Sequence, residues 1–264
     1  MKLGFIGLGN MAGAMIGGIT AKGLVSAADI IGFDPGEEKK KQVREKFGIT
    51  VANDNRAVTE QADIVVLAVK PQMYEGVIRE IRDCIQASQI VISIAPGKTL
   101  EWLTGQFGRE LKLVRCMPNT PALVGEGCTG VCRNAFVTEE EFAAVSALLN
   151  GFGKAYAVEE KQMDAVVAVS GSSPAYVFLL IEAMADAAVA EGLPRAKAYE
   201  FAAQAVYGSA KMVLETGRHP GELKDMVCSP GGTTIEAVAA LEERGFRSAV
   251  IEAMRVCAEK SRTL

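Results

Sequence analysis

The stretch Gly4-Phe5-Ile6-Gly7-Leu8-Gly9-Asn10-Met11-Ala12 decides the fold of this chain. It starts as an apolar strand and runs directly into a helical pattern, with the G-x-G-x-x-A spacing of a dinucleotide-binding turn. Gly7 permits the tight turn, Gly9 lets a pyrophosphate approach the backbone, and Ala12 keeps the helix close to the strand. Backbone N–H groups and the helix dipole then face the anion. The stretch therefore predicts a βαβ unit that binds a dinucleotide.

The first 160 residues alternate short β-branched runs with helical segments, and the runs lack polar alternation. Such runs are typical of parallel strands that are covered on both faces. We therefore expect residues 1–160 to form a Rossmann-type, doubly wound α/β sheet that binds a dinucleotide. The expected strands are residues 3–8, 29–33, 64–69, 90–94 and 112–116, with shorter ones near Thr50, Thr129 and Ala155, and the expected helices include residues 35–47 and 139–150.

Beyond Glu160 the strand pattern disappears, and the sequence becomes rich in Ala, Met, Leu and Glu. We expect residues 161–264 to form an all-α domain that follows the sheet. Pro194 and Gly217 are typical of the start and the stop of one of its helices, and another is expected from Thr234 to Gly245. A small helical domain of this composition buries itself poorly alone, so we expect it to form a homodimer interface.

Composition excludes several classes of partner. The net charge is −4 and only 23% of the residues are charged, which argues against a nucleic-acid surface. Six cysteines without a C-x-x-C pair, together with a single histidine, argue against a metal site and favour a reduced, cytoplasmic protein. The longest charge-free stretch, residues 165–181, contains Gly171 and Pro174 and is shorter than the roughly 20 apolar residues of a membrane span. We therefore expect no membrane segment.

Asp34 bears on the choice of cofactor. It ends the second expected strand, about 20 residues beyond the glycines, where an acid accepts the ribose hydroxyls of NADH. In the alternative interpretation Asp34, followed by Pro35, merely caps the next helix, and both roles are compatible. The lysines at positions 39–41 would soften discrimination against a 2′-phosphate, although such a run is usually a solvated helix face. Asp34 thus favours NADH over NADPH.

Two further segments follow expected parallel strands at their carboxyl ends, where open α/β sheets bind ligands. They are Ala68-Val69-Lys70-Pro71 and Ile94-Ala95-Pro96-Gly97. Lys70 is either a contact of the cofactor or substrate or an ordinary loop lysine. We expect both segments to lie at the cofactor.

The stretch Ser229-Pro230-Gly231-Gly232-Thr233-Thr234 places glycines directly before an expected helix. The N–H groups of Gly232, Thr233 and Thr234 can converge there on an anion such as a substrate carboxylate. The alternative is a glycine-rich turn with a threonine cap, and the residues alone leave both interpretations open.

Five motifs, in this order, resemble the pyrroline-5-carboxylate reductase family along the whole chain. They are Gly-Phe-Ile-Gly-x-Gly at 4–9, Val-Lys-Pro at 69–71, Met-Pro-Asn-Thr-Pro at 117–121, Ser-Gly-Ser-x-Pro-Ala-Tyr at 170–176 and Ser-Pro-Gly-Gly-Thr-Thr at 229–234. The last two are specific to that family, whereas the first is shared with many dehydrogenases. The resemblance implies NADPH- or NADH-dependent reduction of the cyclic imine 1-pyrroline-5-carboxylate to L-proline, the last step of proline biosynthesis. It also implies a homo-oligomer, either a dimer or a larger assembly such as a decamer.

The resemblance further implies the roles of individual residues. Thr234 is implied to be catalytic, because the final threonine of the family's loop hydrogen-bonds the ring nitrogen. The residues implied to bind substrate are Glu160, Ser229, Gly232, Thr233 and Thr234. The motifs and the resemblance together assign the cofactor to Ile6, Gly7, Leu8, Gly9, Asn10, Met11, Asp34, Asn55, Ala68, Val69, Lys70, Pro71, Ala95, Pro96 and Asn119. Two departures are Ser173, where the family usually has glycine, and Cys228, where it commonly has Ser or Thr; the family also often prefers NADPH, in contrast to what Asp34 favours.

Two rival functions fit parts of the sequence. A β-hydroxyacid dehydrogenase would share the opening motif, but it needs a lysine or histidine to handle the alcohol proton. No lysine stands in the Gly-x-x-x-Lys-x-x-Asn setting of those enzymes, and His219, just before Pro220, is expected to cap a helix. A non-catalytic dinucleotide sensor is the other rival, and a second anion-binding loop argues against it.

Overall fold

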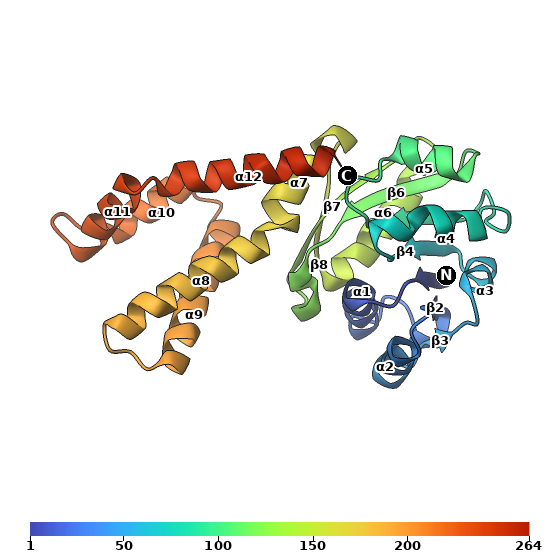
Figure 1. Ribbon diagram of the computed structural model, residues 1–264, viewed down its shortest axis with the longest axis horizontal. Helices are drawn as coiled ribbons and strands as arrows, with labels where there is room; N and C mark the ends of the chain where they lie inside the picture. Colours follow the sequence, from blue (N-terminus) through green and yellow to red (C-terminus); the bar gives the residue numbers. More distant parts are fainter. Residues whose placement is uncertain (264) are drawn as a thin grey trace. The chain divides into compact units, whose positions relative to one another are not determined.

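In the computed structural model, which describes residues 1–263, the chain divides into two compact units (Figure 1). The first unit comprises Met1–Ser172 together with the end of the chain from Cys257 onward, and the second comprises Ser173–Val256. The boundary therefore lies at Ser172 and not at residue 160, and only the end of the last helix, from Cys257 onward, belongs to the first unit. Two side-chain contacts hold this return, from Ser261 Oγ to Asp164 Oδ1 at 2.6 Å and from Cys257 Sγ to Ser172 Oγ at 3.2 Å.

One sheet forms the centre of the first unit, and each of its strands lies at an expected position. In spatial order its strands are β3-β2-β1-β4-β5-β6-β7-β8. The strands are β1 (Leu3–Ile6), β2 (Ile30–Phe33), β3 (Thr50–Val51), β4 (Ile64–Leu67), β5 (Ile90–Ser93), β6 (Lys112–Met117), β7 (Gly127–Arg133) and β8 (Gly153–Ala157).

The strand order places a topological switch point beside β1. Strands β1 to β6 are parallel, and β1 lies between β2 and β4, so the chain crosses to opposite sides of β1 in its two halves. Crevices at such points are where open α/β sheets bind ligands. β7 departs from the parallel pattern and runs antiparallel to β6, because residues 118–126 are fewer than the roughly dozen residues of a parallel crossover.

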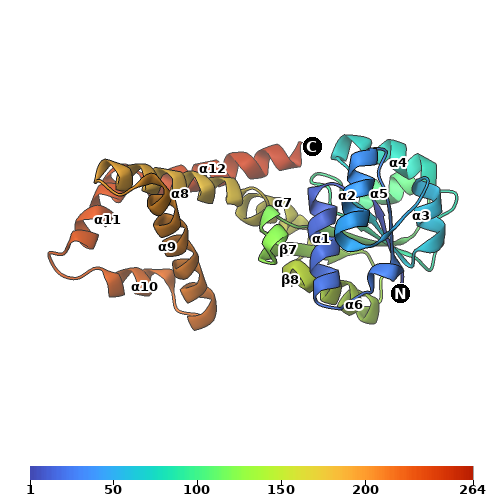
Figure 2. The ribbon, with the colours of Figure 1, turned by 90° about the horizontal axis from the view of Figure 1, so that it is seen from below.

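Helices cover both faces of the sheet, as expected for a doubly wound fold (Figure 1, Figure 2). Alternate residues of a strand point to opposite faces of the sheet: Ile64 and Val66 belong to one apolar core, and Val65 and Leu67 to the other. The first core includes α1 (Asn10–Ala21), α2 (Glu37–Phe47) and α6 (Glu139–Leu149). The second includes α3 (Asn55–Gln61), α4 (Tyr74–Ile81), α5 (Leu100–Phe107) and part of α7 (Met163–Val166). Burial on both faces explains why the strands lack polar alternation.

The second unit consists of helices among the residues that the structure describes. α8 and α9 pack against each other, and their buried side chains are the small residues Ala185, Ala198 and Ala202. Gly217 ends α9 in the left-handed conformation with φ +63°, as its position predicted. The helices are α8 (Ser173–Ala190), α9 (Arg195–Thr216), α10 (Pro220–Val227), α11 (Thr233–Glu243) and α12 (Phe246–Arg262), the last of which ends in the first unit.

A helical run from Glu160 to Ala190 is long and apolar enough to cross a membrane, by length and composition alone. The charge-free stretch at residues 165–181 thus belongs to a longer apolar helical run, although a bend at Ser172 separates the part before it from α8. A π-helical segment, Val167–Gly171, carries the chain through Gly171, and Pro174 stands in the first turn of α8, where its missing N–H costs no hydrogen bond. Only 17% of the most apolar window is buried, so this helix presents apolar surface.

Candidate active site

A cavity of about 530 Å³ lies at the carboxyl ends of the parallel strands. Its walls come from the segments that follow β1, β2, β4 and β5 and from the end of β6, on both sides of the switch point. The residues of the cavity that the sequence led us to expect are Gly7, Gly9, Asn10, Met11, Asp34, Ala68, Val69, Lys70, Pro71, Ala95 and Pro96. Ile94, which belongs to the second expected segment, lines it too. Pro35, Lys39, Met73, Met117 and Pro118 also line it and were not among the residues assigned to the cofactor.

The turn after β1 is shaped to hold a pyrophosphate. Gly7 has φ +94°, and a Cβ at this residue would lie 2.7 Å from the carbonyl oxygen of Ala68, so only glycine fits. Gly9 precedes α1 without a side-chain cap, and a Cβ built on it meets no atom within 4 Å. The first-turn N–H groups of a helix have no intrahelical partners. An open space in front of an uncapped helix therefore fits the phosphates of a dinucleotide.

Asp34 is almost fully buried, with 5% of its surface exposed, and it accepts several hydrogen bonds. Its Oδ2 accepts from the N–H of Leu8 at 3.0 Å, and its Oδ1 accepts from the N–H of Gly36 at 2.9 Å. Burial alone would raise the pKa of this carboxyl, but the hydrogen bonds from these two N–H groups and from Lys39 hold it below its ordinary value. Asp34 is therefore ionised at neutral pH, and it fastens the glycine turn to the end of β2.

Tyr74 supports the opposite wall of the cavity from within the core. Its hydroxyl donates to the carbonyl of Leu67 at 2.6 Å and accepts from Ser93 Oγ and from the N–H of Ile94, each at 3.2 Å. Burial raises the pKa of Tyr74 to about 12, so the hydroxyl stays protonated. One buried hydroxyl thus joins the ends of β4 and β5, directly before the two segments that line the cavity.

Four of the expected cofactor residues do not line this cavity. Ile6 is buried inside β1, and Leu8 contributes its backbone N–H to Asp34. Asn55, at the start of α3, donates to Glu80 Oε2 at 2.6 Å. Asn119 donates to the carbonyl of Ser170 at 2.9 Å and accepts from the N–H of Cys128 at 2.8 Å. The Asn119 amide therefore holds together the loop after β6, the start of β7 and the π-helical segment.

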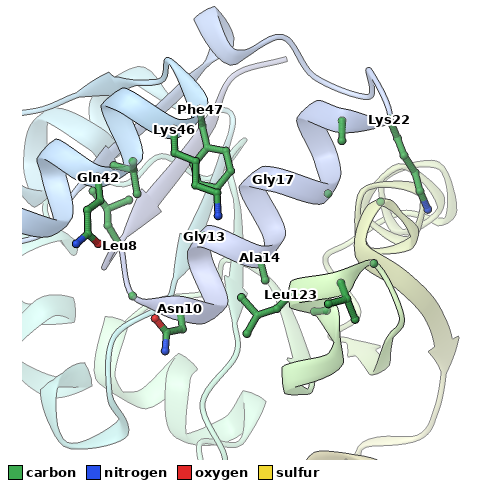
Figure 3. Close-up of a pocket in the computed structure, with 18 residues that line it drawn as sticks. Leu8, Asn10, Gly13, Ala14, Gly17, Lys22, Gln42, Lys46, Phe47 and Leu123 are labelled. Atoms are coloured by element: carbon green, nitrogen blue, oxygen red, sulfur yellow. The ribbon is translucent and has the colours of Figure 1, made fainter. Parts of the chain in front are cut away.

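A second groove, of about 490 Å³, runs along α1 and shares Gly9 and Asn10 with the first cavity (Figure 3). Phe47 of α2 packs against α1 at Gly17, where an added Cβ would approach the ring to 3.0 Å. Figure 3 shows Leu123 on the other side of the helix. The glycines of α1 thus let neighbouring segments approach the helix closely beside the phosphate-binding turn.

The loop from Ser229 to Thr234 forms a second uncapped helix start, in the second unit. Gly232 precedes α11 without a side-chain cap, and its own N–H donates to the carbonyl of Ser229 at 3.0 Å. Gly231 has φ +65°, and a Cβ at Gly232 would lie only 2.4 Å from Ser229 Oγ. The turn therefore favours glycine at position 231, a side chain at position 232 would displace the Ser229 hydroxyl, and the N–H groups of Thr233 and Thr234 open a helix that can hold an anion.

Glu160 lies in the first unit, where it has structural partners. Its Oε1 accepts from the N–H of Leu100 at 2.7 Å, at the start of α5, and from Arg115 Nη1 at 3.1 Å. Arg115 is buried on β6, and its Nε has no hydrogen-bond partner within residues 1–263. Glu160 therefore neutralises a buried guanidinium and caps a helix, and the remaining expected substrate residues lie in the second unit.

His219 stands at the start of α10, and its Nδ1 accepts from the N–H of Gly221 at 3.1 Å. The expected capping role is thereby confirmed. All six cysteines are free thiols, and residues 1–263 contain no group of His, Cys, Asp and Glu side chains that could hold a metal ion.

Comparison with known proteins identifies the family. Residues 160–264 match a family described as pyrroline-5-carboxylate reductase dimerisation, and residues 2–97 match one described as NADP oxidoreductase, coenzyme F420-dependent. The pyrroline-5-carboxylate reductase of Escherichia coli strain K12 is 55% identical over 263 residues, which cover 100% of this chain and 98% of that protein. The chain belongs to the pyrroline-5-carboxylate reductase family.

Solved structures of pyrroline-5-carboxylate reductases share the whole fold. One from Coxiella burnetii matches with a TM-score of 0.93 and 35% identity, covering 99% of this chain and 97% of that one. One from Plasmodium falciparum, described with NADP bound, matches with a TM-score of 0.91 and 34% identity, covering 100% of this chain and 97% of that one. The expected Rossmann-type sheet with a C-terminal helical domain is confirmed.

Membership of the pyrroline-5-carboxylate reductase family also confirms the expected class of enzyme. The chain is an oxidoreductase that uses NAD(P)H, and its dimerisation region supports homo-oligomerisation. The exposed apolar side chains of the second unit agree with this conclusion, because large apolar patches mark interaction surfaces.

Proposed function

We propose that this chain reduces 1-pyrroline-5-carboxylate to L-proline, the last step of proline biosynthesis, with NADH or NADPH as the reductant. The observation that carries the proposal is the uncapped start of α11, where Gly232 leaves the N–H groups of Thr233 and Thr234 to an anion. A dinucleotide cavity alone would serve many dehydrogenases. A second anion-binding loop in the same chain suits a small substrate with a carboxylate.

The proposed site needs little acid–base machinery, because a protonated cyclic imine is already an electrophile. We assign the N–H groups of Thr233 and Thr234 to the substrate carboxylate and the Thr234 hydroxyl to the ring nitrogen. Gly232 belongs to the proposed substrate set as the residue that shapes this turn, because its own N–H donates to the carbonyl of Ser229. Ser229 and Glu160 complete the proposed substrate set. The bound nicotinamide supplies the hydride. Positioning of the imine by these residues then contributes most of the catalysis.

We assign the cofactor to the cavity of the first unit, with the pyrophosphate at the turn that contains Gly7 and Gly9. Ile6, Leu8, Asn55 and Asn119 belong to the proposed cofactor set as residues that support this turn and the walls. Asp34 favours NADH, because a buried, ionised carboxylate accepts ribose hydroxyls and repels a 2′-phosphate. The proposed cofactor residues, beyond those four, are Gly7, Gly9, Asn10, Met11, Asp34, Ala68, Val69, Lys70, Pro71, Ala95 and Pro96.

We propose that two copies of this chain form a homodimer through their second units, and that dimers can assemble further, up to a decamer. Exposed apolar residues occur on several helices of this unit, including Phe178 on α8, Phe201 and Leu214 on α9, and Ile251 on α12. A surface shared by several helices, with charged residues between, suits a second protein copy better than lipid. The proposed location is the cytoplasm, without membrane or nucleic-acid partners.

Purified protein supplied with 1-pyrroline-5-carboxylate, and with NADH or NADPH in parallel, tests the reaction and the cofactor preference together. We expect oxidation of the cofactor with formation of proline, and a higher kcat/KM with NADH. A panel of β-hydroxyacids with NAD serves as the control for the rival dehydrogenase. Turnover of a β-hydroxyacid without imine reduction would refute the proposed reaction, and tight cofactor binding without any turnover would favour a dinucleotide sensor.

A further inference from the structure

An ion pair lies on the wall of the cofactor cavity. Lys39, in the first turn of α2, places its Nζ 3.1 Å from Oδ2 and 3.3 Å from Oδ1 of Asp34. The two partners differ in exposure, since the Lys39 side chain is 52% exposed and that of Asp34 only 7%. Both residues line the cavity. The end of the cavity at β2 therefore carries the buried negative charge of Asp34, paired with the more exposed positive charge of Lys39.

The hydrogen bonds of Asp34 show which partner can leave. A carboxylate accepts at about four lone-pair positions, and the N–H groups of Leu8 and Gly36 occupy one on each oxygen. Lys39 takes up the remaining positions on both oxygens. The two backbone donors are fixed by the fold, whereas a lysine ammonium sits on a flexible four-carbon stem. Ribose hydroxyls can therefore hydrogen-bond to Asp34 only if the Lys39 side chain moves away from the carboxylate.

A 2′-phosphate poses the opposite problem at the same position. It would bring a second negative charge against a carboxylate that stays ionised, and like charges at such a distance repel each other. A cation that already touches Asp34 can bridge the two groups and cancel the repulsion. We propose, on the basis of the NAD(P)H-dependent function proposed above, that Lys39 is a specificity-determining residue that lets this cavity accept NADPH beside Asp34 and turns aside for NADH.

The neighbouring lysines do not share this position. Lys40 pairs with Glu37 Oε1 at 2.5 Å and lies over the ring of Phe33, 5.5 Å from its centroid. Lys41 is exposed on the same helix and does not line the cavity. Of the three consecutive lysines, Lys39 is thus the one whose charge reaches the cavity, and Lys41 offers a matched control for the loss of one positive charge from α2.

Nucleotide fragments test the role of Lys39 without any substrate. Dissociation constants of adenosine 2′,5′-bisphosphate and of ADP are measured by titration calorimetry for the full chain and for Lys39→Gln, Lys41→Gln and Asp34→Asn. We expect Lys39→Gln to weaken the bisphosphate about tenfold, on the scale of one partly exposed charge-assisted hydrogen bond. ADP should bind Lys39→Gln within about twofold of the original chain or more tightly, because the competitor for Asp34 is gone.

The other variants fix the interpretation. Lys41→Gln should leave the ratio of the two dissociation constants unchanged, and Asp34→Asn should shift it towards the bisphosphate. The difference between Lys39→Gln and the original chain should shrink as KCl is raised, because salt screens an exposed charge. Equal weakening of both nucleotides by Lys39→Gln, or the same ratio in Lys39→Gln and Lys41→Gln, would overturn the proposal.

The measurement stands apart from the proposed reaction. If the chain did not reduce the imine, the titrations would still show whether Lys39 binds the 2′-phosphate. If Lys39→Gln left the ratio of the two dissociation constants unchanged, the proposed imine reduction would not be affected. Circular dichroism of each variant excludes misfolding as the cause of a change, and the exposed position of Lys39 makes the substitution compatible with the fold.

Discussion

Thr234 opens α11 at its second residue, beside the glycines that leave this helix uncapped. In the proposed reaction its hydroxyl hydrogen-bonds the ring nitrogen. We expect Thr234→Ala to lower kcat/KM by roughly 10–100-fold, on the scale of one lost transition-state hydrogen bond. Thr234→Ser should recover most of the activity, because it keeps the hydroxyl. Steady-state kinetics with the imine measure both, and unchanged values for Thr234→Ala would remove this residue from the mechanism.

Tyr74 offers a test of the support behind the cofactor cavity. Tyr74→Phe keeps the ring in the core but leaves the carbonyl of Leu67 and the N–H of Ile94 without their side-chain partner. We expect the free energy of unfolding to fall by about 1–3 kcal/mol, the cost of unsatisfied buried polar groups, and cofactor binding to weaken. Urea unfolding and cofactor titration measure the two effects. Tyr207→Phe, at a half-exposed position, is the control that should change neither.

Single residues were predictable from sequence where a local pattern constrains them. Gly7 and Asp34 follow from their spacing relative to the first two strands, and both line the cavity. Tyr74 and Lys39 had no such pattern: a tyrosine at a helix start and a lysine in a charged run look like ordinary core and surface residues. Their roles arise from partners that the fold brings to the same edge of the sheet, which no spacing in the chain records.

At the scale of elements, Glu160 joins α5 to β6. Glu160→Gln removes the counter-charge of buried Arg115 and weakens the cap at Leu100. Because Glu160 is one-third exposed, we expect a loss of about 2–3 kcal/mol in the free energy of unfolding, below the usual cost of breaking a fully buried pair. Urea unfolding measures this loss.

The control for that substitution is Glu101→Gln, which removes a charge from the first turn of the same helix at an exposed position. It should cost only a few tenths of a kcal/mol, about the value of one charge at a helix N-terminus. If Glu160→Gln raised KM for the imine and left the unfolding curve unchanged, Glu160 would act on the substrate and its structural contacts would be unimportant.

The strands and the helix stops were predictable because each depends on local chemistry. Apolar runs without polar alternation marked the buried strands, and Gly48 and Gly217 end their helices in the left-handed conformation that glycine favours. The antiparallel pairing of β7 with β6 and the π-helical segment at Val167–Gly171 were not predicted. The short connection 118–126 was the available signal for the first, because it leaves no room for a parallel crossover. The second lies where the Asn119 side chain donates to the Ser170 carbonyl, a contact across 51 residues that no local pattern records.

At the scale of the whole molecule, exposed apolar side chains on α8, α9 and α12 predict that stability depends on association. Binding of a second copy stabilises the folded state by mass action, so Tm should rise with protein concentration. We expect Phe201→Asp to produce a smaller species in analytical ultracentrifugation and to abolish the concentration dependence of Tm. Phe201 is 66% exposed, so its loss should disturb association more than the fold.

Gln204→Asp, which adds the same charge at an exposed polar position of α9, is the comparison for Phe201→Asp. It should leave the sedimentation behaviour closer to that of the original chain. A Tm that does not change with concentration in the original chain would contradict association through this unit.

The organisation into a sheet followed by helices could be anticipated, because the composition changes near Glu160. The return of the chain to the first unit could not. It depends on contacts of Ser261 with Asp164 and of Cys257 with Ser172, between residues far apart in sequence and unremarkable in type. Such long-range contacts leave no periodicity or turn signal in the chain.

That return makes the helical unit an insertion in the topological sense. The chain leaves the nucleotide-binding unit at Ser172 and re-enters it at Cys257, and the side chains at the exit and the entry touch. An inserted segment whose two ends are adjacent can change in length without changing the path of the chain in the unit that holds it. Because the two junction residues lie side by side, a short linker between Ser172 and Cys257 would close the first unit into one uninterrupted chain.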